Sequence, residues 1–175
     1  MQSAQDALAV LRTLGASPWL VRHHELVVEA ASLLLAGLKG VRIDRGAVLI
    51  GAALHDAGKI VHPEEQAAPG HLHEEAGRVL LLSHGVPAEL ARFCVTHAAW
   101  HEAEALEDLL VALADKLWKG KREPALEQRV VDRIAALTGE EPWAAFDRID
   151  ALCETIAAGG DDRLARSTGS VLAMP

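Results

Sequence analysis

Residues 45–59 read RGAVLIGAALHDAGK, and this stretch decides the fold. Its apolar residues are continuous over 47–54, without the alternation of a half-buried strand, so it predicts a helix buried on all sides. Asp44 stands where an N-cap would lie, and Gly58 where the helix would end. The last turn carries His55 and Asp56, which places an imidazole and a carboxylate in the interior.

A buried carboxylate at the end of this helix requires a cation nearby. The C-terminus of a helix carries partial negative charge, and a buried carboxylate without a partner also loses its hydration. Lys59 can neutralise Asp56 as a simple ion pair. A metal ion held by His55 and Asp56 is the alternative, and this segment alone does not separate the two interpretations.

The rest of the chain predicts an all-α protein, a single compact helical bundle over residues 1–160. Alanine and leucine are abundant, and only 3% of the residues are aromatic. A first helix is expected up to about residue 14, and a second begins at Ser17-Pro18, an N-cap and first-turn pair. Further helices are expected over roughly 45–58, 72–84, 87–99, 104–119, 124–138 and 142–158. Residues 161–175 are expected to form a tail that is loosely ordered or docks on a partner.

Composition excludes several classes of function. The 175 residues include 17 Lys and Arg against 25 Asp and Glu, a net charge of −8, which argues against binding long nucleic acid or an anionic membrane. We find no secretory signal pattern and no apolar run near the ~20 residues that span a bilayer, and we expect a cytoplasmic protein. Two cysteines, Cys94 and Cys153, exclude a disulfide scaffold. Nine histidines are unusual in such a chain and require a chemical explanation.

Two of these histidines lie in the second predicted helix, VRHHELVVEAASLLLAGL, residues 21–38. His23 shares the core-facing side with Val27, and His24 lies toward the other edge of the apolar face beside Val28. Either ring can reach a buried site, and a buried histidine with an ordinary hydrogen-bond partner is the alternative for each.

In the residues around these histidines, around His55-Asp56 and around Asp115, the chain resembles the HD-domain superfamily of metal-dependent phosphohydrolases. RHHELVVEAA, LHDAGK and VALADKLWK are similar to the family's segments around its H…HD…D ligand pattern. Aligning the first segment places the ligand at His23 rather than at His24. The stretch HLHEEAGRVLLLSHGVPAELARFCVTHAAW, residues 71–100, resembles the part that carries two more histidines in members with a dinuclear centre. The resemblance covers residues 18–120 and implies the metal ligands His23, His55, Asp56, His73, His97 and Asp115.

This resemblance implies an activity and a cofactor. Imidazole and carboxylate ligands suit Fe, Mn, Zn, Co or Ni, and two such ions bridged by Asp56 would activate water for attack at phosphorus. Lys59 would face the substrate phosphate. The implied substrate is a small phosphorylated molecule, with a nucleotide as the first expectation, and a homodimer is a further expectation. Two alternatives remain open: an HD-fold di-iron oxygenase and a non-catalytic nucleotide-binding regulatory module.

Several other residues receive an ordinary interpretation first. The basic segment LWKGKRE, residues 117–123, is typical of a solvated helix end, although it can also hold a distal phosphate. Trp100 and Trp118 follow predicted ligands closely and either pack in the core or wall the pocket. The remaining histidines are expected in loops or near helix ends; they are His62, His71, His84 and His101.

Overall fold

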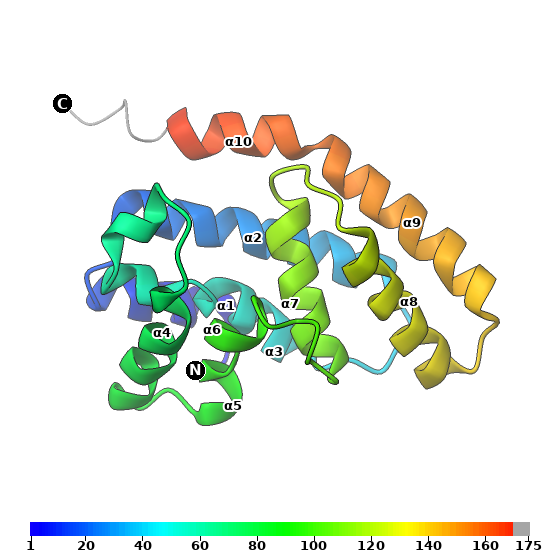
Figure 1. Cartoon of the computed structure of the whole chain (residues 1–175), viewed down its shortest axis with the longest axis horizontal. Coiled ribbons are helices and arrows are strands. Elements are labelled where there is room, and N and C mark those ends of the chain that lie inside the picture. Colours follow the sequence, from blue (N-terminus) through cyan, green and yellow to red (C-terminus); the bar gives the residue numbers. More distant parts are fainter. Residues whose placement is uncertain (170–175) are drawn as a thin grey trace.

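A computed structural model describes residues 1–169 of the chain. Within those residues it contains helices and no strand, which confirms the all-α prediction. The elements, shown in Figure 1, are α1 (Ala4–Thr13), α2 (Pro18–Gly37), α3 (Arg45–Leu54), the 3₁₀ helices η1 (Ala57–Ile60) and η2 (Pro63–Gln66), α4 (Leu72–Ser83), α5 (Ala88–Ala91), α6 (Phe93–Thr96), α7 (Leu106–Leu117), α8 (Pro124–Thr138), α9 (Pro142–Ala158) and α10 (Gly160–Gly169).

Side-chain hydrogen bonds cap the N-termini of α2 and α3, the two helices that position the first predicted ligands. Ser17 Oγ accepts a hydrogen bond from the Leu20 N–H at 3.1 Å, and Pro18 is the first residue of α2. Asp44 Oδ1 accepts from the Ala47 N–H at 2.9 Å at the start of α3. Both caps satisfy backbone donors that have no partner within the helix. They therefore fix where α2 and α3 start.

Helix α3 ends earlier than the sequence predicts. Its last residue is Leu54, His55 is its C-cap, and Asp56 leads into η1 with φ −104° and ψ 19°. After this turn η1 packs directly against α4, so closely that a Cβ added to Gly58 would lie 1.8 Å from the carbonyl oxygen of His73. The turn brings Asp56 to face α4 instead of continuing along α3.

The single helix predicted over 87–99 is divided in two. Helices α5 and α6 meet at Arg92, whose guanidinium donates to the Glu89 carbonyl and to the carboxylate of Asp108 on α7. The Arg92 side chain thus takes up a carbonyl of the preceding turn and ties this segment to α7.

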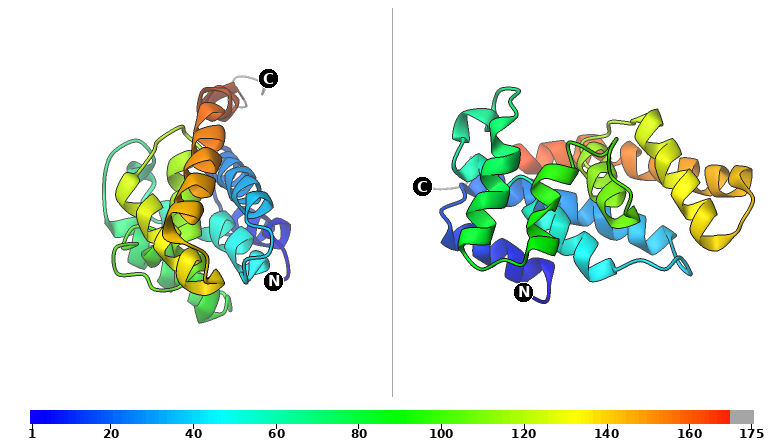
Figure 2. Two further views of the ribbon diagram at one scale, coloured as in Figure 1. Left: turned by 90° about the vertical axis from the view of Figure 1, so that its right-hand side faces the viewer. Right: turned by 60° about the horizontal axis from the view of Figure 1, so that its bottom comes forward.

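The interior is centred on α2, α3 and α7, which pack on one another. A second apolar cluster joins α1 and α3 to the start of the α5 and α6 segment. Figures 1 and 2 show that α8 and α9 lie at the end of the molecule opposite α4 and α5. Within residues 1–169, none of the helices combines the length and apolar character that crossing a bilayer demands.

The C-terminal segment differs from the expected tail in its first part. Residues 160–169 form α10, where Arg163 is 3% exposed and donates from Nε to the Trp118 carbonyl at 2.7 Å. Arg166 makes two hydrogen bonds of 2.8 Å to Glu29 on α2. These arginines dock α10 on the chain itself. The remainder of the predicted tail, 170–175, lies outside the described residues, and the domain boundary at residue 160 stays a prediction.

Candidate metal centre

The structure brings all the predicted ligands into one buried cluster. His23 comes from α2, and His55 and Asp56 follow α3 directly. The other three come from α4, from the residue after α6 and from the last turn of α7. Each is no more than 7% exposed; they are His23, His55, Asp56, His73, His97 and Asp115.

The carboxylate of Asp56 lies between two pairs of histidines. Its Oδ2 is 3.2 Å from His23 Nε2 and 3.6 Å from His55 Nε2. Its Oδ1 is 3.1 Å from His73 Nε2 and 3.5 Å from His97 Nε2. Within residues 1–169, the side chains thus offer two groups of potential metal ligands that share Asp56, and in each group the donor atoms lie within 4.8 Å of one another.

Asp115 lies beside the first of these groups. Its Oδ1 is 3.6 Å from His55 Nε2, and its Oδ2 accepts a hydrogen bond from Lys116 Nζ at 2.9 Å. One carboxylate oxygen therefore faces the histidines and the other faces the lysine. This position allows Asp115 to complete the ligand set of an ion held by His23, His55 and Asp56.

The outer ring nitrogens show which way the histidines present their lone pairs. His55 Nδ1 lies 3.0 Å from the Ala52 carbonyl oxygen, and His97 Nδ1 lies 3.0 Å from that of Phe93. Because a carbonyl oxygen only accepts, we assign a proton to Nδ1 of each ring, so that Nε2 is the nitrogen available to a metal ion. Both Nε2 atoms face the oxygens of Asp56. Imidazole nitrogens and carboxylate oxygens directed toward one point are the donors that divalent transition metals take, so this donor set fits a metal ion.

Charge in the cluster favours a cation as well. Burial raises the pKa of Asp56, but the surrounding histidines outweigh burial and hold this pKa well below the ordinary aspartate value. Burial likewise raises the pKa of Asp115, and His55 together with neighbouring lysines outweighs it and holds that pKa well below the ordinary value. Burial lowers the pKa of His97 to about 4. Near neutral pH the site therefore holds ionised carboxylates beside a neutral imidazole, the protonation states that metal ligands require.

His23, and not His24, faces the cluster. His24 is fully buried, and its Nδ1 lies 3.3 Å from the Ala52 carbonyl oxygen instead of contacting Asp56. The His23 ring stacks against Trp19 at 5.9 Å and meets the edge of the buried Trp118 at 5.0 Å. These contacts fix the orientation of His23, the ring that the family pattern selects. Coordination by His23 itself stays a prediction.

The position of Lys59 is compatible with both roles that the sequence allows, an ion pair with Asp56 and a contact with the substrate phosphate. Its Nζ donates to Asp56 Oδ2 at 2.6 Å, and its side chain keeps 18% of its surface exposed. An ammonium has three donors, so this ion pair leaves donors available for a ligand. The contact is therefore compatible with a role at a substrate phosphate.

Glu65, a residue that the sequence analysis missed, supports His73 from outside the cluster. Its Oε2 lies 2.5 Å from His73 Nδ1 and accepts the His73 backbone N–H at 3.1 Å, while Oε1 accepts the N–H of Leu72 at 3.1 Å. Burial raises the pKa of Glu65, but these donors outweigh burial and lower it to about 2. No motif marks Glu65, because its contact depends on the path of the loop over residues 67–71. The only signal in the sequence is that Glu65 lies between the helices predicted over 45–58 and 72–84, eight residues before the predicted ligand His73.

The other four histidines lie outside the cluster. His62 contacts Glu64, and His71, His84 and His101 are exposed. Trp100 is partly buried against the core, whereas Trp118 contacts His23.

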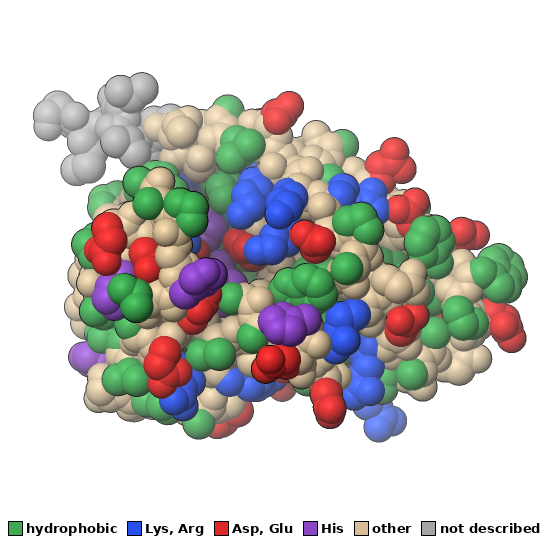
Figure 3. All heavy atoms as spheres, viewed as in Figure 1, with side chains coloured by type: hydrophobic (Ala, Val, Ile, Leu, Met, Phe, Trp, Pro, Cys, Tyr) green, Lys and Arg blue, Asp and Glu red, His purple; other side chains and the backbone are tan. Residues whose placement is uncertain are grey.

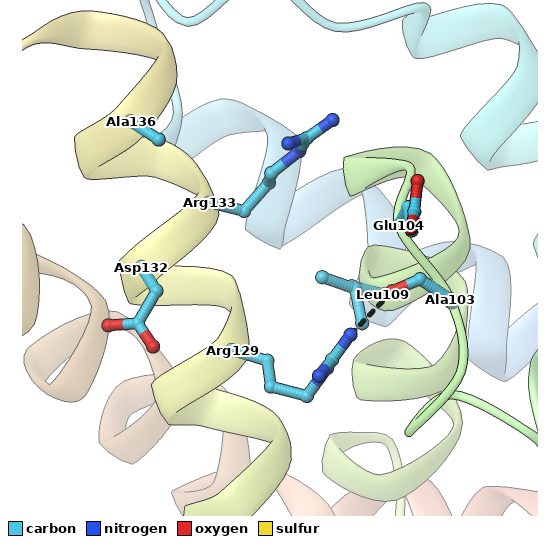
Figure 4. Close-up of a pocket in the computed structure, with 7 residues that line it drawn as sticks. All are labelled: Ala103, Glu104, Leu109, Arg129, Asp132, Arg133 and Ala136. Atoms are coloured by element: carbon cyan, nitrogen blue, oxygen red, sulfur yellow. Dashed lines mark hydrogen bonds between the residues drawn. The ribbon is translucent and has the colours of Figure 1, made fainter.

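A separate hollow of about 450 Å³ lies between α8 and the loop before α7 (Figure 4). Arg129 donates across it to the Ala103 carbonyl at 2.6 Å. Its walls mix both charges, since Arg133 is accompanied by Glu104 and Asp132. The hollow contains none of the clustered histidines, so we assign the chemistry to the cluster.

Comparison with known proteins agrees with the geometry. The family model of the HD domain matches residues 20–138, a range that holds all six clustered residues and extends through α8. This range is more than half of the 175-residue chain, and the protein therefore belongs to the HD-domain family. HD domains bind divalent metal ions, and most are metal-dependent phosphohydrolases. No curated protein and no solved structure matches the chain.

Replacing Glu65 by glutamine is expected to weaken metal binding. A carboxylate that holds the outer nitrogen of a ligand histidine fixes the ring and raises its basicity, and losing it costs roughly 10- to 100-fold in metal affinity. The measurement is metal content after dialysis against graded chelator, with Glu75→Gln as the control, because Glu75 is exposed and its carboxylate accepts hydrogen bonds from Arg78. Equal metal retention by both variants would show that Glu65 does not support the ligand.

Proposed function

We propose that this protein is a phosphohydrolase that uses two divalent metal ions to cleave a phosphate ester or anhydride of a small molecule, with a nucleotide as the first candidate substrate. The observation that carries this proposal is the position of Asp56, whose two oxygens face two different pairs of histidines. A shared carboxylate of this kind suits a pair of ions held close together.

The proposed division of ligands follows the contacts. His23, His55, Asp56 and Asp115 would hold one ion, and Asp56, His73 and His97 the other. Fe, Mn, Zn, Co and Ni all suit imidazole and carboxylate donors. When bound, such ions activate water and offset charge on phosphoryl oxygens.

The chain's own residues then have separate tasks. Lys59, beside Asp56, would bind a non-bridging oxygen of the phosphate and orient the phosphorus toward the cluster. Glu65 holds His73 with its Nε2 directed at Asp56. The apolar packing of α2, α3 and α7 excludes bulk water from the rear of the site and strengthens each charge interaction there.

A nucleotide panel tests this proposal directly. Protein loaded separately with each of the five metals is incubated with nucleoside mono-, di- and triphosphates and dinucleotides. We expect release of inorganic phosphate or of a nucleoside monophosphate. Chelator should abolish this release, and added metal should restore it. Tight nucleotide binding without turnover would instead indicate a regulatory module, and O₂ consumption by the iron-loaded protein would indicate an oxygenase.

A further inference from the structure

The lysines near the cluster are distributed unevenly around it. Lys116 Nζ is 2.9 Å from Asp115 Oδ2, and Lys119 Nζ is 3.9 Å from the same oxygen. Lys59 contacts the oxygen of Asp56 that faces His23 and His55. All three ammonium groups thus lie beside carboxylate oxygens of the first ligand group.

The opposite side of the cluster carries negative charge. Behind the ring of His73 lies the buried carboxylate of Glu65, whose Oε2 is 2.5 Å from His73 Nδ1. The site is therefore polarised, with cations on the side of Asp115 and an anion behind His73. An extended anionic substrate is therefore stabilised when its chain extends from the cluster toward Asp115, and not when it extends toward His73.

The two lysines beside Asp115 have more donors than this carboxylate uses. Asp115 offers them the single oxygen Oδ2, since Oδ1 faces His55. The side chains of Lys116 and Lys119 keep 22% and 37% of their surface exposed, so their remaining N–H groups are accessible to a ligand. In Figure 3, Lys and Arg side chains gather beside a hollow in which histidine and acidic side chains are visible.

The basic residues of the segment over 117–123 therefore have different partners. Arg122 is engaged by Glu127 and Asp150, and Lys121 lies near Glu123 at 3.7 Å. Lys119 instead faces Asp115, as does Lys116 just before the segment.

We propose that Lys116 and Lys119 form a subsite for a second phosphate group, so that the substrate is a compound with at least two phosphates whose chain extends from the metal centre toward the end of α7. This inference rests on the proposed function and specifies its substrate class. A compound with a single phosphate would leave both ammonium groups without a ligand partner.

Equilibrium binding tests the subsite without requiring turnover. The probes are methylphosphonate and methylenediphosphonate, whose P–C bonds resist hydrolysis, titrated calorimetrically into metal-loaded protein. Because each lost hydrogen bond to a charged group weakens binding by roughly tenfold or more, we expect Lys116→Gln/Lys119→Gln to lose roughly tenfold or more of its affinity for the diphosphonate. Affinity for the monophosphonate should stay within about twofold. Metal content measured after each titration separates binding of the diphosphonate from removal of metal by it.

Lys121→Gln is the matched control, since Lys121 is a lysine of the same segment whose side chain is 58% exposed and lies near Glu123. It should bind both probes as the unmodified protein does. Lys119→Gln alone should show a partial loss with full metal content. An unchanged ratio of the two affinities in the double variant, or loss of its bound metal, would overturn the proposal, because the lysines would then only neutralise Asp115. Absence of turnover on every nucleotide, with the binding preference intact, would contradict the hydrolase function and leave the subsite standing.

Discussion

Substitution of Asp56 by asparagine is expected to lower the proposed hydrolytic activity at least about a thousandfold, because the several kcal/mol that bound metal would contribute to phosphoryl transfer are lost. Asp56 is the residue that both candidate ligand groups share. Asparagine offers one neutral oxygen, and its amide N–H groups would donate to the Nε2 lone pairs that otherwise face a metal. Elemental analysis and turnover on the best substrate of the panel provide the measurement.

The variant should remain folded, because asparagine keeps the size and shape of the side chain, although the loss of the ion pair with Lys59 should lower its thermal stability. Asp108→Asn is the control: Asp108 is 5% exposed against 3% for Asp56, but it pairs with Arg92 and Thr96 and belongs to neither group of candidate ligands. This control should keep its metal and its turnover even if its thermal stability falls. An Asp56→Asn protein that retains two ions and full activity would contradict the assignment.

Substitution of Gly58 by alanine is expected to cost about 3 kcal/mol or more of unfolding free energy. The added Cβ would lie 1.8 Å from the His73 carbonyl oxygen and 2.6 Å from the Gly77 nitrogen. Both atoms belong to backbone, so η1 and α4 must separate, and Asp56 and His73 with them. For a chain of this length the melting temperature should fall by roughly 6–12 °C, with loss of metal at the His73 side.

Gly46→Ala provides the comparison, because Gly46 lies in the first turn of α3 and the nearest atom to its added Cβ is Asp44 Oδ1 at 3.4 Å. Alanine is favoured over glycine in helices, so this variant should be as stable as the unmodified protein or slightly more stable. Equal melting temperatures for the two variants would show that the contact between η1 and α4 tolerates a methyl group.

The elements and the approximate position of the site could be predicted because both depend on local pattern. The apolar run before His55 sets a buried helix, Asp44 caps it, and family spacing marks the histidines further along the chain. The choice of His23 over His24 required the family pattern, since helical periodicity allows both. The contacts with Asp56 show which ring faces the cluster.

Features that depend on loop paths and side-chain competition could not be predicted. Glu65 reaches His73 only because of how the chain crosses between η2 and α4. The interruption at Arg92 follows from a guanidinium that takes a backbone carbonyl. The docking of α10 depends on Arg163, whose acceptors include the carbonyl of Trp118, 45 residues away in sequence.

The positive charge near the cluster contrasts with the acidic balance of the whole chain. A net charge of −8 still argues against long nucleic acid. Around the cluster, however, Lys59, Lys116 and Lys119 concentrate positive charge, and bound divalent ions would add to it. A small anionic substrate is therefore compatible with an acidic surface.

The central claim is that Asp56 bridges two metal ions, and a crystal structure of the metal-loaded protein with anomalous scattering data tests it most directly. The account predicts two anomalous peaks, one contacted by His23, His55, Asp56 and Asp115 and the other by Asp56, His73 and His97. A single peak at the first position, with His73 and His97 directed away from it, would contradict the claim.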